Sequence, residues 1–219
     1  MDKEGELDIV ARKLMIHAGL CDNLGLEYGK TGFVIFFYKY YRYKGDPIIE
    51  LFAEELLDDL FNCIKDYQYD YRKYLLGIAL GIDYLIHNKF IDSEDDVMLD
   101  FDNQIMEYQT HSTGIDNGIQ GAVYYILSRC KNKNCSLTEE YVRSISNLLQ
   151  QVESNNNELI FLRRQIEDLL NGNNCFSSDI ISVLINNNRN EKNTELTLLG
   201  IHNGLAGLGL QLMHEIELS

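Results

Sequence analysis

The chain has 219 residues, 45% of them hydrophobic, and its single proline is Pro47. It can therefore bury a sizeable core, and it almost lacks the residue that most strongly interrupts helices. Its 34 Asp and Glu residues outnumber its 19 Lys and Arg residues, which gives a formal charge of −15. This charge disfavours phosphate backbones and anionic lipid surfaces, so we expect no nucleic-acid partner and no membrane partner.

The five cysteines are odd in number and scattered, unlike the dense, even set of a small secreted disulfide framework. We therefore expect reduced thiols. Cys130 and Cys135 are separated by four residues, a wider gap than the C-x-x-C typical of zinc and redox sites.

Targeting and membrane signals are not apparent. The first six residues are acidic and no continuous apolar run follows them, which predicts a cytoplasmic chain without a signal peptide. The most apolar stretch, residues 31–43, is interrupted by Lys39 and Arg42 well short of the ~20 residues that span a bilayer. We therefore expect a soluble protein with one domain over residues 1–219.

In chain order, charged amphipathic stretches alternate with more apolar ones, and each pair predicts a helical hairpin. The charged helices are expected near 6–18, 47–65, 94–109, 136–153 and 176–187. The more buried helices are expected near 29–43, 69–88, 118–130, 158–170 and 203–217. The helix at 158–170 lacks a preceding glycine signature, and four of its charged residues are expected to be exposed: Arg163, Arg164, Glu167 and Asp168.

A glycine signature with the spacing Gly-apolar-x-x-Gly-x-x-Gly recurs, and an apolar stretch that is expected to be helical follows each copy. Its four copies begin at Gly25, Gly77, Gly114 and Gly200, and only the second departs, with Tyr84 in place of the last glycine. The starts of successive copies are 52, 37 and 86 residues apart. A repeat period in the forties is typical of helical-hairpin arrays. Glycine permits the close backbone approach and unusual dihedral angles that a turn entering a buried helix requires.

These residues resemble lanthionine synthetase C-like proteins, and the resemblance extends from about Gly25 to Ile216. The segment Leu199-Gly200-Ile201-His202-Asn203-Gly204-Leu205-Ala206-Gly207-Leu208 is most similar to that family's later repeats. The resemblance implies an α/α toroid, in which inner helices surround a cavity and outer helices surround the inner ones. Family members have seven hairpins, so about five imply a shortened or partial toroid.

In the family's zinc-dependent cyclases, a cysteine from one repeat and a Cys-His pair before the next Gly-x-x-Gly hold the metal. The corresponding positions here are His202 and Asn203, and the chain contains no tryptophan for a Trp-Cys-Tyr-Gly segment. Catalytic zinc needs three protein ligands, and an asparagine amide is a poor substitute for imidazole or thiolate. We therefore expect no metal site and no cofactor, since zinc is not supported by the ligand pattern.

The third position of each signature is expected to face a similar direction in every hairpin. With neighbouring polar residues, these positions predict a polar ring at one end of the toroid. The ligand-binding candidates on it are Glu27, Tyr28, His111, Asp116, Asn117, His202 and Asn203. The candidates for proton transfer are Asp83, Asp116 and His202. Capping of helix N-termini explains the same residues without a ligand.

Three functions stay open from the sequence. The first is a degenerate lanthionine synthetase C-like protein that binds a ribosomally made peptide or assists its modification, without zinc cyclase activity. The second is a hydrolase or cyclase that uses the polar ring. The third is an interaction protein that completes its toroid by pairing with a second copy or with a modification enzyme.

Overall fold

The computed structural model describes residues 2–65, 70–92, 95–108, 110, 112–131, 135–152, 157–173, 180–189 and 198–218. Within these ranges the regular structure is helical and contains no strand, which confirms the all-α prediction. None of the helices described has both the length and the apolar composition needed to cross a membrane.

All ten expected helices are present, and most of their boundaries agree within a few residues. The five charged helices are α1 (Lys3–Ala18), α3 (Pro47–Lys65), α5 (Asp95–Glu107), α7 (Glu139–Gln151) and α9 (Ile180–Arg189). The five expected to be more buried are α2 (Lys30–Lys44), α4 (Leu75–His87), α6 (Ile119–Arg129), α8 (Asn157–Leu170) and α10 (Leu205–Glu217). The largest difference is at α4, which begins after the short 3-10 helix η1 (Tyr71–Tyr74).

Burial follows the composition of each helix. Ten consecutive or near-consecutive residues of α2 are buried, whereas α3 buries only the stripe that includes Ile49, Leu56 and Leu60. Helix α8 behaves as an amphipathic helix and buries Leu159, Leu162 and Ile166. The expected exposure of Arg164, Glu167 and Asp168 is confirmed, and Arg163 is half-buried because its guanidinium donates to backbone carbonyls.

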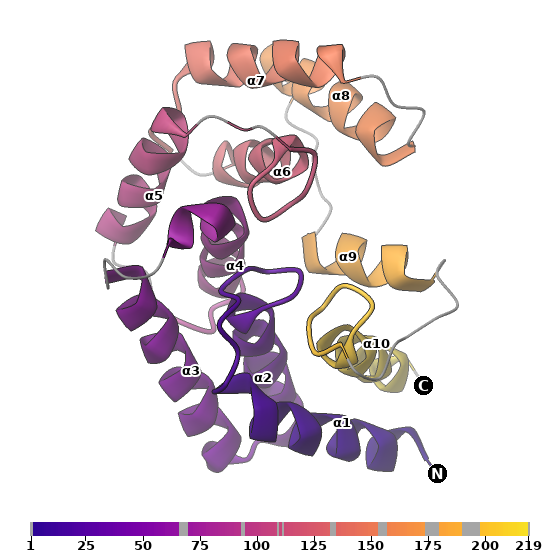
Figure 1. Cartoon of the computed structure of the whole chain (residues 1–219). Helices are drawn as coiled ribbons and strands as arrows, with labels where there is room; N and C mark the ends of the chain where they lie inside the picture. The colour runs from indigo at the N-terminus through magenta and orange to yellow at the C-terminus, as the bar shows by residue number, and fades with distance from the viewer. Residues whose placement is uncertain are drawn as a thin grey trace. The chain divides into compact units, whose positions relative to one another are not determined.

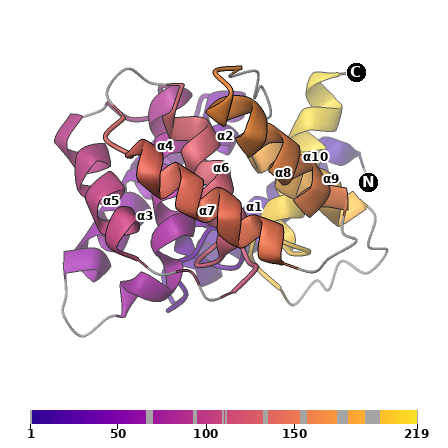
Figure 2. The same cartoon turned by 90° about the horizontal axis from the view of Figure 1, so that it is seen from above.

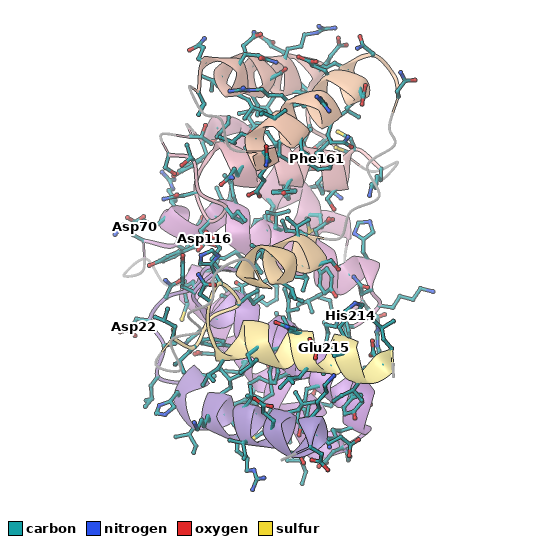
Figure 3. The ribbon with its side chains drawn as sticks, turned by 90° about the vertical axis from the view of Figure 1, so that its right-hand side faces the viewer. Asp22, Asp70, Asp116, Phe161, His214 and Glu215 are labelled. Carbon is teal, nitrogen blue, oxygen red and sulfur yellow. The ribbon has the colours of Figure 1, made fainter. Side chains whose placement is uncertain are left out.

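The chain divides into two compact units, and the expectation of one domain over 1–219 stays a prediction. Unit 1 comprises Met1–Tyr71 and Asp179–Ser219, and it joins the first and last helices of the chain. Within it, α10 packs against α1, α2 and α9, and α2 packs against α3 (Figure 1). Lys3 of α1 forms an ion pair of 3.1 Å with Glu215, which projects from α10 (Figure 3).

Unit 2 comprises Arg72–Ser178. Its central helix is α6, which contacts α4, α7 and α8, while α5 packs against α4. Helices α7 and α8 lie side by side (Figure 2). Tyr124 and Tyr125 of α6 are among the largest fully buried side chains of the described residues.

Three of the four glycine signatures form one recurring loop. The loop residue before each helix, Gly29, Gly118 or Gly204, has extended backbone angles and no side-chain cap. Instead, the first N–H groups of the helix donate to carbonyls seven residues back: Lys30 to Asn23, Ile119 to Ser112, and Leu205 to Leu198, all at 2.9 Å. The loop itself therefore satisfies the N–H groups that a helix start leaves free.

The second signature has a different structure. Gly77 and Gly81 lie inside α4, as the helix expected at 69–88 places them, so this copy does not form a loop before a helix as the other three do. Small residues four apart are equally compatible with close packing of a continuous helix, and the sequence pattern alone does not separate the two settings. The N–H groups at the start of α4 are instead satisfied by the loop before α6. Leu76 N and Gly77 N donate to the Asp116 carbonyl at 3.1 and 3.2 Å.

Candidate functional site

The first and last glycine loops meet in unit 1. The His202 N–H donates to the Glu27 carbonyl at 2.9 Å. A Cβ at Gly200 would lie 2.3 Å from that carbonyl oxygen and 2.5 Å from the Tyr28 Cα, so only glycine permits this approach. The absence of a side chain at Gly200 thus brings the side chains of the two loops together.

Four of the ligand-binding candidates form one cluster at this junction, which we call the His202 cluster: Glu27, Tyr28, His202 and Asn203. The Tyr28 and His202 rings meet edge to face with centroids 5.4 Å apart. The Glu27 carboxylate lies 4.0 Å from His202 Nδ1, and Asn203 Nδ2 lies 3.3 Å from Nε2. The cluster is open to solvent, with Tyr28 44% exposed and the His202 side chain 28% exposed.

The neighbours of His202 favour one neutral tautomer. An Asn203 amide that donates to Nε2 requires this nitrogen to accept, which leaves the proton on Nδ1 facing the Glu27 carboxylate. At 4.0 Å the contact between His202 Nδ1 and the Glu27 carboxylate is too long for a direct hydrogen bond. Asn203 reaches this position with a φ of +52°, a left-handed conformation that asparagine tolerates better than most residues.

The cluster does not fit the zinc site that the family resemblance implies. His202 and Glu27 offer two good ligand types, and the third neighbour is the Asn203 amide, so the set of three that catalytic zinc needs is incomplete. Among the residues that the structure describes, no group of three or more His, Cys, Asp or Glu side chains is placed to hold a metal ion.

The remaining candidates on the polar ring belong to unit 2. The carbonyl of Asp116 supports the start of α4, as described above, and the side chain of Asn117 accepts a hydrogen bond of 2.8 Å from the Ser112 hydroxyl. Figure 3 shows Asp116 in the loop before α6. His111 lies outside the described residues. The structure therefore groups four of the seven candidates, and the complete ring stays a prediction.

Side-chain capping, the alternative interpretation of these polar residues, does not account for the loops. The residues at the cap positions of α2, α6 and α10 are glycines, and backbone carbonyls accept from the first-turn N–H groups. These helix starts therefore need no carboxylate or amide side chain to satisfy them, and the polar side chains of the His202 cluster are not required as caps.

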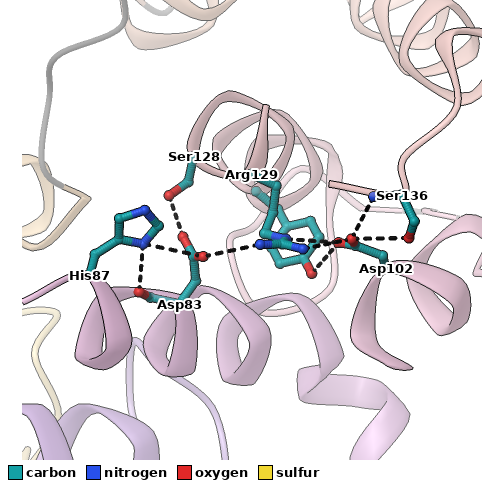
Figure 4. A network of polar contacts seen from close by, with 7 residues as sticks. Asp83, His87, Asp102, Ser128, Arg129 and Ser136 are labelled. Atoms are coloured by element: carbon teal, nitrogen blue, oxygen red, sulfur yellow. Dashed lines mark hydrogen bonds and ion pairs between the residues drawn. The ribbon is translucent and has the colours of Figure 1, made fainter. Parts of the chain in front are cut away.

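We expected Asp83 to lie close to the polar ring. It is instead buried in the middle of α4. It lies seven residues beyond Leu76, or ~10 Å along the helix axis from the Asp116 contact. Its carboxylate accepts from the Ser128 hydroxyl and lies 3.3 Å from His87 Nδ1 and 3.9 Å from Arg129 Nη1 (Figure 4). Because the serine donates to the aspartate and not to the histidine, this Ser, His and Asp set lacks the geometry of a nucleophilic triad.

The same figure shows a buried ion pair that we did not predict from the sequence. Arg129 donates two hydrogen bonds to Asp102, from Nε at 3.0 Å and from Nη2 at 2.8 Å (Figure 4). Tyr125 Oη and both the N–H and hydroxyl of Ser136 donate to the same carboxylate at 2.7 to 3.1 Å. A signal was present in the sequence, because Asp102 falls on the apolar stripe of α5 with Met98 and Ile105.

This network makes stability depend on pH. Burial raises the pKa of Asp102, but hydrogen bonds from Arg129, Ser136 and Tyr125 outweigh it and lower the pKa below its ordinary value. A folded pKa below the unfolded one gives stability that is present above pH ~4 and is lost as the pH falls through the folded value. We expect urea unfolding at pH 2–4 to show this loss in the wild type and a smaller one in Asp102→Asn. An equal loss in both proteins would contradict the assignment.

Comparisons with known proteins identified no relative of this chain. No family model, curated protein or solved structure matches the chain.

Proposed function

We propose that the chain is a shortened lanthionine synthetase C-like protein that binds a peptide at the His202 cluster, without zinc cyclase chemistry. The proposed architecture is an α/α toroid of about five hairpins. Two findings support it: charged and buried helices alternate along the chain, and the last buried helix, α10, packs against the first, α2. Three recurring glycine loops before buried helices agree with the family resemblance.

One observation carries the binding function: loops from the two ends of the chain place an aromatic ring, a carboxylate, an imidazole and an amide side by side. The exposed Tyr28 ring offers apolar area with little side-chain entropy to lose. Glu27 accepts hydrogen bonds, and Asn203 both donates and accepts, which matches the alternating N–H and C=O groups of a peptide backbone. The net charge of −15 attracts peptides that carry Lys or Arg.

We expect peptides selected on the wild-type protein to depend on this cluster. Linear peptides would be selected from a displayed random library and their dissociation constants measured by fluorescence anisotropy. His202→Ala and Glu27→Ala should each raise the dissociation constant about tenfold or more, because truncating a hot-spot residue at the centre of an interface costs ~2 kcal/mol or more and ~1.4 kcal/mol is tenfold.

His17→Ala is the matched control, since His17 is an exposed histidine near the end of α1 in the same unit. Its peptide affinity should stay at the wild-type value. Circular dichroism would show that every variant keeps its helical content. Binding that is unchanged in both the His202 and Glu27 variants would remove the cluster from the proposal, whereas equal loss in the His17 variant would indicate nonspecific attraction.

A further inference from the structure

Two cysteine thiols of unit 2 are held against each other. Cys130 ends α6, and its side chain is hydrogen-bonded to that of Cys135. Neither cysteine is part of a disulfide, and both are half-buried, so each thiol retains some access to solvent. The C-x-x-x-x-C spacing gave no indication of this contact.

The Asp102 carboxylate explains the proximity of the two thiols. Arg129, the residue before Cys130, and Ser136, the residue after Cys135, both bind that carboxylate. Both ends of the segment from Arg129 to Ser136 are thereby fixed on one buried carboxylate. The cysteine pair is thus a consequence of the ion-pair network and does not rely on chance proximity of exposed side chains.

The two thiols have different surroundings. Cys130 lies at the C-terminus of α6, where the partial negative charge of the helix end disfavours a thiolate. The hydrogen bond from Cys130 and a backbone hydrogen bond at Leu137 outweigh burial and lower the pKa of Cys135. The hydrogen bond to Cys135 raises the pKa of Cys130, and burial raises it further. The pair therefore has one ionisable thiol and one thiol that keeps its proton.

We propose that Cys130 and Cys135 form a reversible redox site that reacts with low-molecular-weight disulfides. The Cys135 thiolate attacks one sulfur of the disulfide, forming a mixed disulfide and releasing one small thiolate. Cys130 then loses its proton and attacks the Cys135 sulfur, which forms the internal disulfide and releases the second small thiolate. Two protein thiols are oxidised and one small disulfide is reduced to two thiols, so electrons balance and the protons pass to solvent and to the released thiolates.

Cys21 supplies an internal comparison. Burial raises its pKa, and its thiol donates to the Asn23 carbonyl at 3.6 Å. At neutral pH it is less ionised than Cys135, and a thiol of lower pKa reacts faster there even though its thiolate is intrinsically less nucleophilic. We therefore expect Cys135 to react about tenfold faster than Cys21 at pH 7.

The test is a reaction of the reduced full-length chain with oxidised glutathione at pH 7, quenched with acid and mapped by mass spectrometry. The wild type should yield an internal Cys130–Cys135 disulfide with the loss of two hydrogens. Cys130→Ser should accumulate glutathione on Cys135, because the resolving thiol is missing. Cys135→Ser should leave Cys130 largely unmodified over the same time, and Cys63→Ser should behave as the wild type.

Alkylation by iodoacetamide gives a second readout that separates the hydrogen bond from simple exposure. Cys130→Ser keeps a hydroxyl donor for the Cys135 thiolate and should keep its fast alkylation, whereas Cys130→Ala removes the donor and should slow it. Circular dichroism would verify folding in each variant. Glutathione spread evenly over Cys21, Cys63 and Cys135, or a wild type that gains glutathione without forming the internal disulfide, would overturn the proposal.

Discussion

Replacing Arg129 by methionine is expected to cost about 3–5 kcal/mol of unfolding free energy at pH 7. The change leaves the Asp102 carboxylate, whose side chain is 0% exposed, without its cationic partner. It also removes the more distant Arg129 contact to Asp83. Chemical unfolding in urea, followed by far-ultraviolet circular dichroism, measures this loss.

The matched control removes the charge together with its partner. Arg129→Met combined with Asp102→Asn should recover a large part of the lost stability, because it removes the uncompensated charge. The amide oxygen can still accept from Ser136, and its Nδ2 can donate to the Tyr125 hydroxyl oxygen. In the single Arg129→Met variant, Asp102 should have a raised folded pKa. The loss of unfolding free energy relative to the wild type should therefore be smaller below pH ~4 than at pH 7. Single and double variants of equal stability would show that the ion pair does not hold unit 2 together.

Replacing Gly121 by alanine is expected to destabilise the chain by about 3 kcal/mol or more. Gly121 lies in the first turn of α6, where an added Cβ would be 1.9 Å from the Ile115 carbonyl oxygen. Because that atom belongs to the backbone of the recurring loop, the whole loop would have to move. The midpoint of urea unfolding should fall accordingly.

Gly19→Ala is the control for this substitution. Gly19 also lies at a helix end, but it has ordinary helical angles, and an added Cβ meets no atom within 4 Å. Alanine there should be neutral or stabilising by up to ~1 kcal/mol, since it reduces the freedom of the unfolded chain. If the two variants unfold at the same urea concentration, the close loop packing before α6 is wrong.

The helices and three of the four loops could be predicted because their signals are local. Apolar periodicity identified all ten helices, and the glycine spacing at Gly25, Gly114 and Gly200 identified a loop whose hydrogen bonds to the helix start span about seven residues. The same spacing at Gly77 was misleading, because small residues at intervals of four also suit the interior of a packed helix.

The network of unit 2 could not be predicted because it depends on distant pairings. Arg129 and Asp102 are 27 residues apart, and Ser128 and Asp83 are 45 apart. A buried charge in an apolar stripe indicates that a partner exists, but the sequence does not say which residue supplies it. The grouping of Glu27 with His202 was expected from their shared position in the glycine signature together with the toroid that the resemblance implies, and the structure brings these two together inside one unit.

Amide hydrogen exchange of the native protein tests the central claim most directly, since that claim is the meeting of the first and last glycine loops. Three amides carry it: His202, which donates to Glu27, and Lys30 and Leu205, which donate within their own loops. We predict that all three exchange slowly and that Gly200→Ala abolishes the protection of His202. A His202 amide that exchanges at the rate of an exposed loop in the wild type would contradict the claim, and the His202 cluster with it.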